Sequence, residues 1–159
     1  MKKLVVFLAV CSIAAACNFS VGTKKDLITG LVVKNSGLSV GDAVLIDNDN
    51  RQTKSTEVTL GTTVAIVAQE IGGYELKDGR AYPGLDLNVV DVDGKVVLEG
   101  TDILASEEGL SPEDAAVLRG TITVGSPMVS GKTYHAKMRV WDKLKPENEI
   151  TVDVDLLVK

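Results

Sequence analysis

The clearest pattern in the chain is the strict alternation of apolar and polar residues in two runs near its C-terminus. Residues 134–141 and 150–158 each place every second side chain on one face of a strand. A polar segment that contains Pro146, residues 142–149, separates the two runs, so we expect an antiparallel hairpin with its apolar faces turned to one core. Its outer face would then set His135, Lys137 and Arg139 beside Asp153 and Asp155.

Shorter β-rich runs precede this hairpin and are separated by turn residues. They cover 28–34, 43–46, 56–60, 63–69, 87–92, 95–99 and 121–124. Asp93-Gly94 predicts a two-residue type I′ turn. Ser111-Pro112 predicts the start of one short helix near 112–119, because serine caps a helix and proline fits its first turn. Few connections are long enough for a βαβ crossover, so the sequence predicts an all-β, two-sheet antiparallel sandwich of about eight or nine strands.

One part of the first C-terminal run resembles a known fold family. A glycine turn at Gly131 precedes Tyr134, which opens the strand, and Val140-Trp141-Asp142 follow. This arrangement resembles the penultimate strand of immunoglobulin-like sandwiches, although the cysteine often found two residues after the tyrosine is Ala136 here. The resemblance covers about a fifth of the chain and implies an Ig-like architecture and no activity.

The N-terminus has the pattern of an export signal. Lys2 and Lys3 precede a short apolar run, 4–13, and Ala14-Ala15-Ala16 are the small residues that a signal peptidase needs. The apolar run is shorter than the roughly 20 residues needed to span a bilayer. We therefore expect a signal peptide over 1–16, a lipidated N-terminus and tether over 17–27, and the β-sandwich domain over 28–159.

Cys17 follows the small residues directly and resembles the acylated cysteine in the lipobox of bacterial lipoproteins. The usual leucine three positions earlier is replaced by Ala14, which leaves ordinary secretion as the alternative. The resemblance implies a lipid on Cys17 and, because Asn18 is not the aspartate of an inner-membrane retention signal, the periplasmic face of the outer membrane. The processed chain has a formal charge of −7, obtained by removing two lysines from −5, and a body this acidic should be repelled by an anionic lipid surface.

Composition excludes or disfavours several classes of function. The net charge and the lack of a basic run are unfavourable for nucleic acid, whose phosphates require a basic surface. His135 is the single histidine and falls on the outer face of a strand, where we interpret it as an ordinary surface residue. The sequence contains no nucleophile elbow, phosphate loop or dinucleotide fingerprint, so we predict a protein that is not an enzyme and has no cofactor.

Calcium is the one metal for which the chain offers candidate ligands. Two Asx-rich segments supply hard oxygen atoms, and the candidates are Asp47, Asp49, Asp91 and Asp93. Neither segment matches the EF-hand pattern, and such loops are common without a metal.

The aromatic residues suggest a different kind of contact surface. The longest stretch without a strand pattern, 71–86, contains Tyr74 and Tyr82, and Trp141 falls on the polar side of its strand. An exposed Trp141 near the two tyrosines would form a partner or ligand site, whereas a Trp141 covered by the 71–86 loop would not.

Two functions follow from these observations. The first is a non-enzymatic, lipid-anchored interaction or accessory subunit that acts on another envelope protein, because an anchor concentrates a small domain at a membrane. The alternative is a binding module for a small ligand, a carbohydrate or calcium. The sequence names neither the partner nor the ligand.

Overall fold

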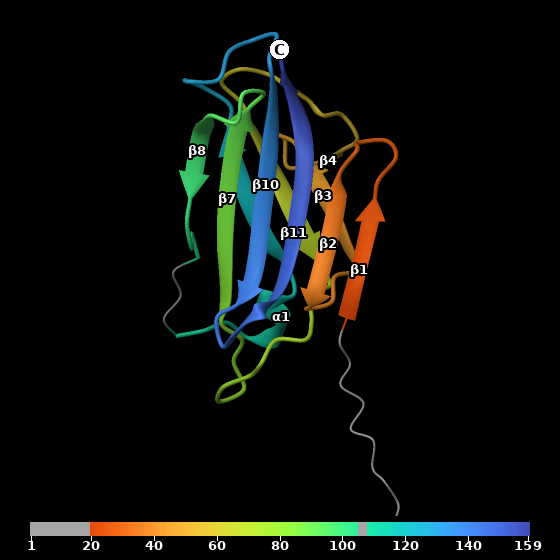
Figure 1. Ribbon diagram of the computed structural model, residues 1–159, viewed down its shortest axis with the longest axis vertical. Helices are drawn as coiled ribbons and strands as arrows, with labels where there is room; N and C mark the ends of the chain where they lie inside the picture. The colour runs from red at the N-terminus through yellow and green to blue at the C-terminus, as the bar shows by residue number, and fades with distance from the viewer. Residues whose placement is uncertain (1–19, 105–107) are drawn as a thin grey trace, which may run out of the picture.

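Two antiparallel sheets pack face to face in the computed structural model of the chain, which describes residues 20–104 and 108–159 (Figure 1). The larger sheet has the strand order β1 (Ser20–Lys25), β2 (Val32–Gly37), β11 (Lys145–Val158), β10 (Thr133–Asp142), β7 (Pro83–Asp91) and β8 (Val96–Gly100). The smaller sheet has the order β4 (Gln52–Thr53), β3 (Asp42–Ile46), β6 (Thr63–Gln69) and β9 (Leu118–Thr123). A two-residue strand, β5 (Glu57–Val58), pairs in parallel with the end of β11. The predicted all-β sandwich is confirmed, and nine of these strands have five residues or more.

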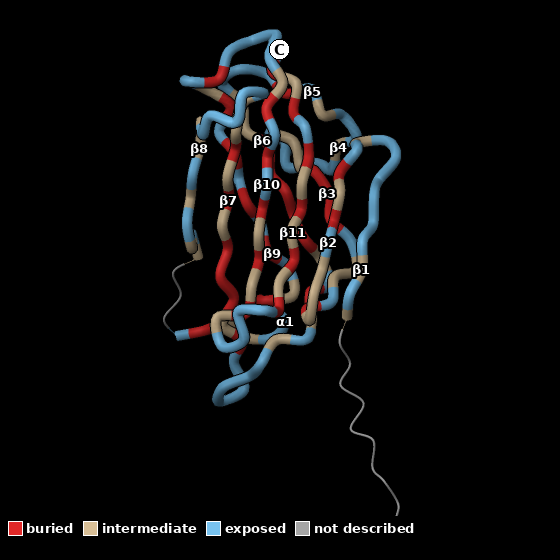
Figure 2. The backbone as a smooth tube through the Cα atoms, in the orientation of Figure 1, coloured by how far each residue is buried: buried red, intermediate tan, exposed pale blue. Residues whose placement is uncertain are grey.

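The core lies between the sheets and is formed by the inward side chains of the alternating strands (Figure 2). Met138 and Val152, on neighbouring strands of the larger sheet, are fully buried, and Ile66 faces them from the smaller sheet. Tyr134 is also buried, and its hydroxyl accepts the Val129 N–H at 2.9 Å. A tyrosine that binds the backbone just upstream of its own strand is a feature of Ig-like sandwiches.

The first strand lies inside the segment that the sequence predicted as a tether. β1 pairs with β2 over six residues, so the sandwich begins at Ser20 rather than at residue 28. The pattern failed here because β1 lies at the edge of the larger sheet and four of its six side chains are exposed. The predicted signal peptide and Cys17 lie outside the described residues.

The helix α1 (Pro112–Ala115) is a single turn and is shorter than the predicted 112–119. Its predicted cap is present, since the Ser111 side chain accepts the Asp114 N–H at 3.1 Å. The residues after α1 are not helical as predicted, because β9 begins at Leu118, and Gly120 within it pairs with Ile66. A side chain at Gly120 would approach Met138 and Leu87 to 3.1 and 3.2 Å, so the two sheets are close at this point.

Two turns differ in detail from their predictions. The β7–β8 hairpin forms, but its turn is not of type I′. That type requires a positive φ at both central residues, and here Gly94 has a φ of 80° whereas the φ of Asp93 is not positive. The Asp91 carboxylate instead accepts the N–H groups of Asp93 and Lys95. The β10–β11 hairpin has a tight turn at 143–144, and Pro146 lies within β11 near a register shift, where a missing N–H is tolerated.

Candidate functional site

The outer face of the larger sheet carries a band of charged side chains across three strands, which we call the charged band. It consists of His135, Lys137 and Arg139 on β10, Glu149, Asp153 and Asp155 on β11, and Asp86 on β7. These residues share one face because side chains at every second position of a strand point the same way. The predicted neighbours are confirmed, since His135 pairs with Asp155 and Lys137 with Asp153.

Arg139 is the centre of this band. Its Nε donates to Glu149 Oε2 at 2.6 Å, and its Nη1 lies 3.7 Å from Asp86 Oδ2 on the other side. Its guanidinium carbon lies 4.8 Å from the centroid of the Trp141 ring, within cation–π range. Contacts on three sides therefore hold this cation in one place on the face.

Trp141 is half-buried because its ring lies on the backbone of β7. It pairs with Gly84, and a Cβ added at Gly84 would stand 2.2 Å from two carbon atoms of the indole ring. A glycine is required where an aromatic ring and a neighbouring backbone approach this closely. The tryptophan thus forms part of the outer face beside Arg139. The residue that covers one side of its ring is Gly84, which the sequence pattern placed in the 71–86 loop and which the structure places in β7.

Tyr74 and Tyr82, the two tyrosines of the predicted contact surface, each contact a residue in or near α1. The Tyr74 hydroxyl donates to the Ala115 carbonyl oxygen at 3.3 Å, and its ring packs against the core. Burial raises the pKa of Tyr74 well above its usual value, and the negative charge of Asp142 raises it further. The Tyr82 ring lies against Gly109, where an added Cβ would be 3.0 Å away. Both tyrosines therefore contact the loops around α1.

His135 bridges two carboxylates on the neighbouring strand. Its Nδ1 lies 2.9 Å from Asp155 Oδ1, and its Nε2 lies 3.1 Å from Asp153 Oδ1. The hydrogen bond with Asp155 raises the pKa of His135, against the opposing effect of partial burial, and the bond with Asp153 raises it further. A ring with an acceptor at each nitrogen favours the protonated form, so the two carboxylates shift His135 toward the cationic state.

A hollow of about 250 Å³ adjoins the band between β7, β8 and β10. Its polar lining combines acceptors and donors, namely Asp86, Asn88, Glu99, Thr101, Lys137 and Arg139. Reasoning from the sequence missed this site, because the β7 and β8 side chains were not paired with β10. The sequence did contain one signal: Asp86 and Asn88 are two positions apart at the start of the run 87–92, so both side chains lie on the same face of that strand.

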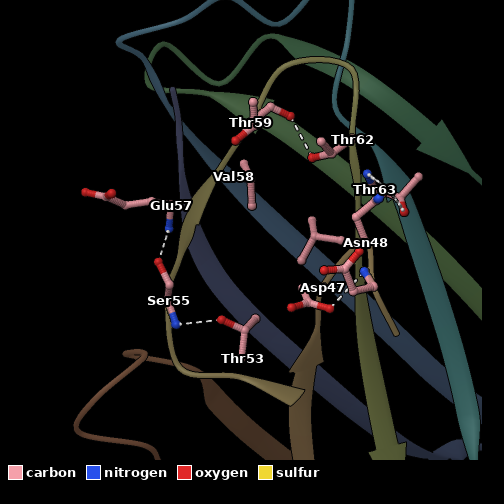
Figure 3. A pocket seen from close by; sticks show the side chains of 11 residues that line it. Asp47, Asn48, Thr53, Ser55, Glu57, Val58, Thr59, Thr62 and Thr63 are labelled. Carbon is pink, nitrogen blue, oxygen red and sulfur yellow. Dashed lines mark hydrogen bonds between the residues drawn. The ribbon is translucent and has the colours of Figure 1, made fainter. Parts of the chain in front are cut away.

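A larger and more polar hollow, of about 300 Å³, lies at the end of the sandwich near the C-terminus (Figure 3). Hydroxyl and carboxylate groups line it, among them Asp47, Asp49, Glu57, Thr53 and Thr63. Several of these groups bond to one another or to the local backbone, as Thr53 Oγ1 does in accepting the Ser55 N–H.

The calcium candidates lie in two separate turns. Asp47 accepts the N–H groups of Asp49 and Arg51, and the Asp49 carboxylate pairs with the Arg51 side chain. Asp91 and Asp93 belong to the β7–β8 turn and line a different hollow. Within residues 20–104 and 108–159, no group of three His, Cys, Asp or Glu side chains has the arrangement of a metal site. Asp47 and Asp91 therefore have a turn-forming role in this structure.

Comparison with known proteins shows a likeness of fold. No family model matches the sequence, and no curated protein matches it. Among solved structures, the crystal structure of the C-terminal domain of Wzt superposes with a TM-score of 0.51 at 13% identity, covering 89% of this chain and 78% of that one. At this identity the likeness concerns the β-sandwich alone. In the part of the chain that the structure describes, no helix has the length and apolarity to cross a membrane.

Proposed function

We propose that this protein is a non-enzymatic, lipid-anchored accessory domain of the bacterial envelope. The observation that carries the proposal is that β1 starts at Ser20, three positions after Cys17. Three residues extend for about 10 Å at most, so an acyl group on Cys17 would hold the sandwich against its membrane. The proposed location is the periplasmic face of the outer membrane.

We further propose that the charged band is the surface that binds an envelope protein. Its cations lie along β10 and its carboxylates lie along β11 and at Asp86 of β7, and cross-strand contacts hold His135 and Arg139 in place. Adjacent rows of opposite charge select a partner with the complementary rows and suppress others, which contributes more to specificity than to affinity. The half-buried Trp141 next to Arg139 offers an apolar contact of the kind that is enriched at protein interfaces.

The test combines acyl labelling with crosslinking in cells. Wild type should incorporate an alkyne-bearing palmitate analogue and give a defined crosslinked partner by mass spectrometry, and Cys17→Ser should do neither. Lys137→Gln, within the band, should weaken the crosslink, whereas Lys132→Gln, an exposed lysine outside the band, should not. Unlabelled wild type, or equal recovery from all four proteins, would count against the proposal.

A carbohydrate-binding module is the second candidate, and the hollow between β7, β8 and β10 favours it. Its mixed carboxylate, amide and cationic lining can both donate to and accept from sugar hydroxyls, and Arg139 with Trp141 lies at its side. Oligosaccharides released from the bacterial envelope should then shift the NMR signals of Lys137 and the Trp141 indole. A thermal midpoint that changes between calcium and a chelator would instead favour the calcium-dependent form of this module.

A further inference from the structure

The tip of the β1–β2 hairpin presents two adjacent apolar side chains to solvent. Leu27 is 91% exposed and Ile28 is 66% exposed, and Val21 on the same edge strand is 69% exposed. The tip lies at the end of β1 opposite Ser20 and projects beyond β2 (Figures 1 and 2). Single exposed apolar residues are ordinary, but neighbouring ones on a projecting turn indicate a contact with another apolar phase.

The backbone of this turn is held by its own hydrogen bonds. Asp26 Oδ1 accepts the Ile28 N–H at 2.7 Å, and the Asp26 carbonyl accepts the Gly30 N–H at 2.9 Å. The Asp26 N–H in turn donates to the Leu31 carbonyl at 2.9 Å. The backbone that carries the two apolar side chains is therefore held in place, and little backbone entropy would be lost when they insert into a second phase.

The hairpin is also the basic part of an acidic molecule. Residues 20–37 contain three lysines and one aspartate, whereas residues 38–159 contain 12 Lys and Arg against 21 Asp and Glu. The hydrogen bond from the Ile28 N–H to the Asp26 carboxylate lowers the pKa of Asp26. The lysines of the hairpin are Lys24, Lys25 and Lys34, and the Nζ of Lys24 donates to the Gly41 carbonyl at 2.8 Å.

We propose that the β1–β2 hairpin docks the protein onto an anionic phospholipid surface, with Leu27 and Ile28 inserted among the acyl chains and the lysines at the headgroups. Apolar side chains bordered by lysines are the pattern of segments that lie in a membrane interface, and lysines near an anionic surface add electrostatic attraction. The repulsion expected from the net charge is weakened at this edge, because all the acidic residues except Asp26 belong to the rest of the molecule.

This docking does not depend on an acyl group at Cys17, but such a group would fix the orientation of the protein on the membrane. β1 is an edge strand of six residues, about 20 Å long, that runs from Ser20 near Cys17 to the tip. A lipid at one end and an inserted tip at the other would lay this edge along the membrane. The charged band, on the sheet face perpendicular to that edge, would remain open to a partner.

The experiment uses the chain from residue 17 with Cys17→Ser, which retains every strand that the structure describes and lacks the proposed acyl acceptor. Its sedimentation is measured with vesicles of phosphatidylethanolamine and phosphatidylglycerol, and with vesicles of phosphatidylcholine alone. Binding to the anionic vesicles should fall by about tenfold or more in Leu27→Ser/Ile28→Ser, in Lys24→Gln/Lys25→Gln, and at high salt. The matched control is Val92→Ser, a 74% exposed valine on the β7–β8 turn, and it should bind like the parent.

A probe at the tip gives an independent reading of insertion. The Cys17→Ser chain from residue 17 has no other cysteine, so Leu27→Cys and Val92→Cys can each carry one environment-sensitive dye. The dye at position 27 should shift to the blue on anionic vesicles and the dye at position 92 should not. Equal sedimentation of the parent and the tip variants, or no shift at position 27, would overturn the proposal. So would self-association that Leu27→Ser abolishes, which would assign the tip to a second copy of the chain. These results are independent of acylation, which palmitate labelling tests separately.

Discussion

The outer face of the larger sheet shows how single residues acquire properties that their type alone does not give. His135 was interpreted from the sequence as an ordinary surface residue, and at 46% side-chain exposure it is on the surface. Its two carboxylate partners nevertheless raise its pKa and favour the charged ring. Because Asp153 and Asp155 are consecutive outward residues of β11, the bridge also fixes the register of β10 against β11.

The stability of the sandwich should therefore depend on pH through His135. A pKa that is higher in the folded than in the unfolded state stabilises the fold below about pH 6.5, and this contribution is lost as the pH rises through the folded pKa. His135→Gln should reduce the free energy of unfolding by a few tenths of a kcal/mol at acidic pH, a small effect because the pair is exposed, and should have no effect at alkaline pH. Urea unfolding at both pH values measures this. The control is Lys137→Gln, which removes a neighbouring cation of the band and leaves the histidine in place. Its effect should be the same at both pH values, and an equally pH-independent profile for His135→Gln would refute the bridge.

At the scale of elements, one buried carboxylate, that of Asp142, joins two segments that are far apart in the sequence. Asp142 is completely buried at the end of β10, where its carboxylate accepts the Glu75 N–H at 2.6 Å and the Leu144 N–H at 2.9 Å. One side chain therefore joins the β6–β7 loop to the β10–β11 turn. This explains how a long stretch without strand pattern is kept in contact with the core through Tyr74.

Asp142→Ala should lower the free energy of unfolding by about 2–3 kcal/mol, because two N–H groups would lose their shared acceptor. Asp142→Asn should cost less, since its amide oxygen can still accept one of them. Hydrogen exchange at the Glu75 amide should accelerate in both variants before global unfolding. Glu75→Ala is the control, because it removes a nearby carboxylate and leaves the same backbone donor in place. Unchanged exchange at Glu75 in Asp142→Ala would show that this bond does not hold the loop.

The elements that the sequence predicted most accurately are long strands whose apolar residues alternate with polar ones, as in β10, or follow one another, as in β6, where both faces are buried. β6 was predicted with its observed bounds and β10 to within one residue at each end, because their apolar side chains alternate or run together over a whole strand. β1 could not be found this way, because an edge strand buries little and Lys24 and Lys25 read as a polar tether. The hollow beside Lys137 was missed for another reason, since it depends on which strands are neighbours, and local patterns do not contain that information.

At the scale of the whole molecule, the charge is divided between an acidic body and a basic edge. The net charge alone predicts repulsion from a membrane, whereas the position of the lysines on the β1–β2 hairpin permits attraction over one edge. The hairpin contains the edge strand that follows Cys17, and the charged band lies on a face that this edge does not cover. The same sheet can therefore present one surface to lipid and another to a partner.

The segment 20–27 decides whether this arrangement is part of the fold. A chain that begins at residue 20 should unfold at the same urea concentration as one that begins at residue 17, because every described strand is kept. A chain that begins at residue 27 loses β1, including the hydrogen bonds from Asn35 Nδ2 to Ser20 Oγ and from Lys24 Nζ to the Gly41 carbonyl. We expect it to lose about 1–2 kcal/mol and to self-associate, because β2 would become an uncovered edge with free backbone N–H and C=O groups. Urea unfolding and analytical ultracentrifugation measure the two effects. If the shortest chain matched the others in both, 17–27 would be a tether after all, and the hairpin tip would have no fixed place from which to reach a membrane.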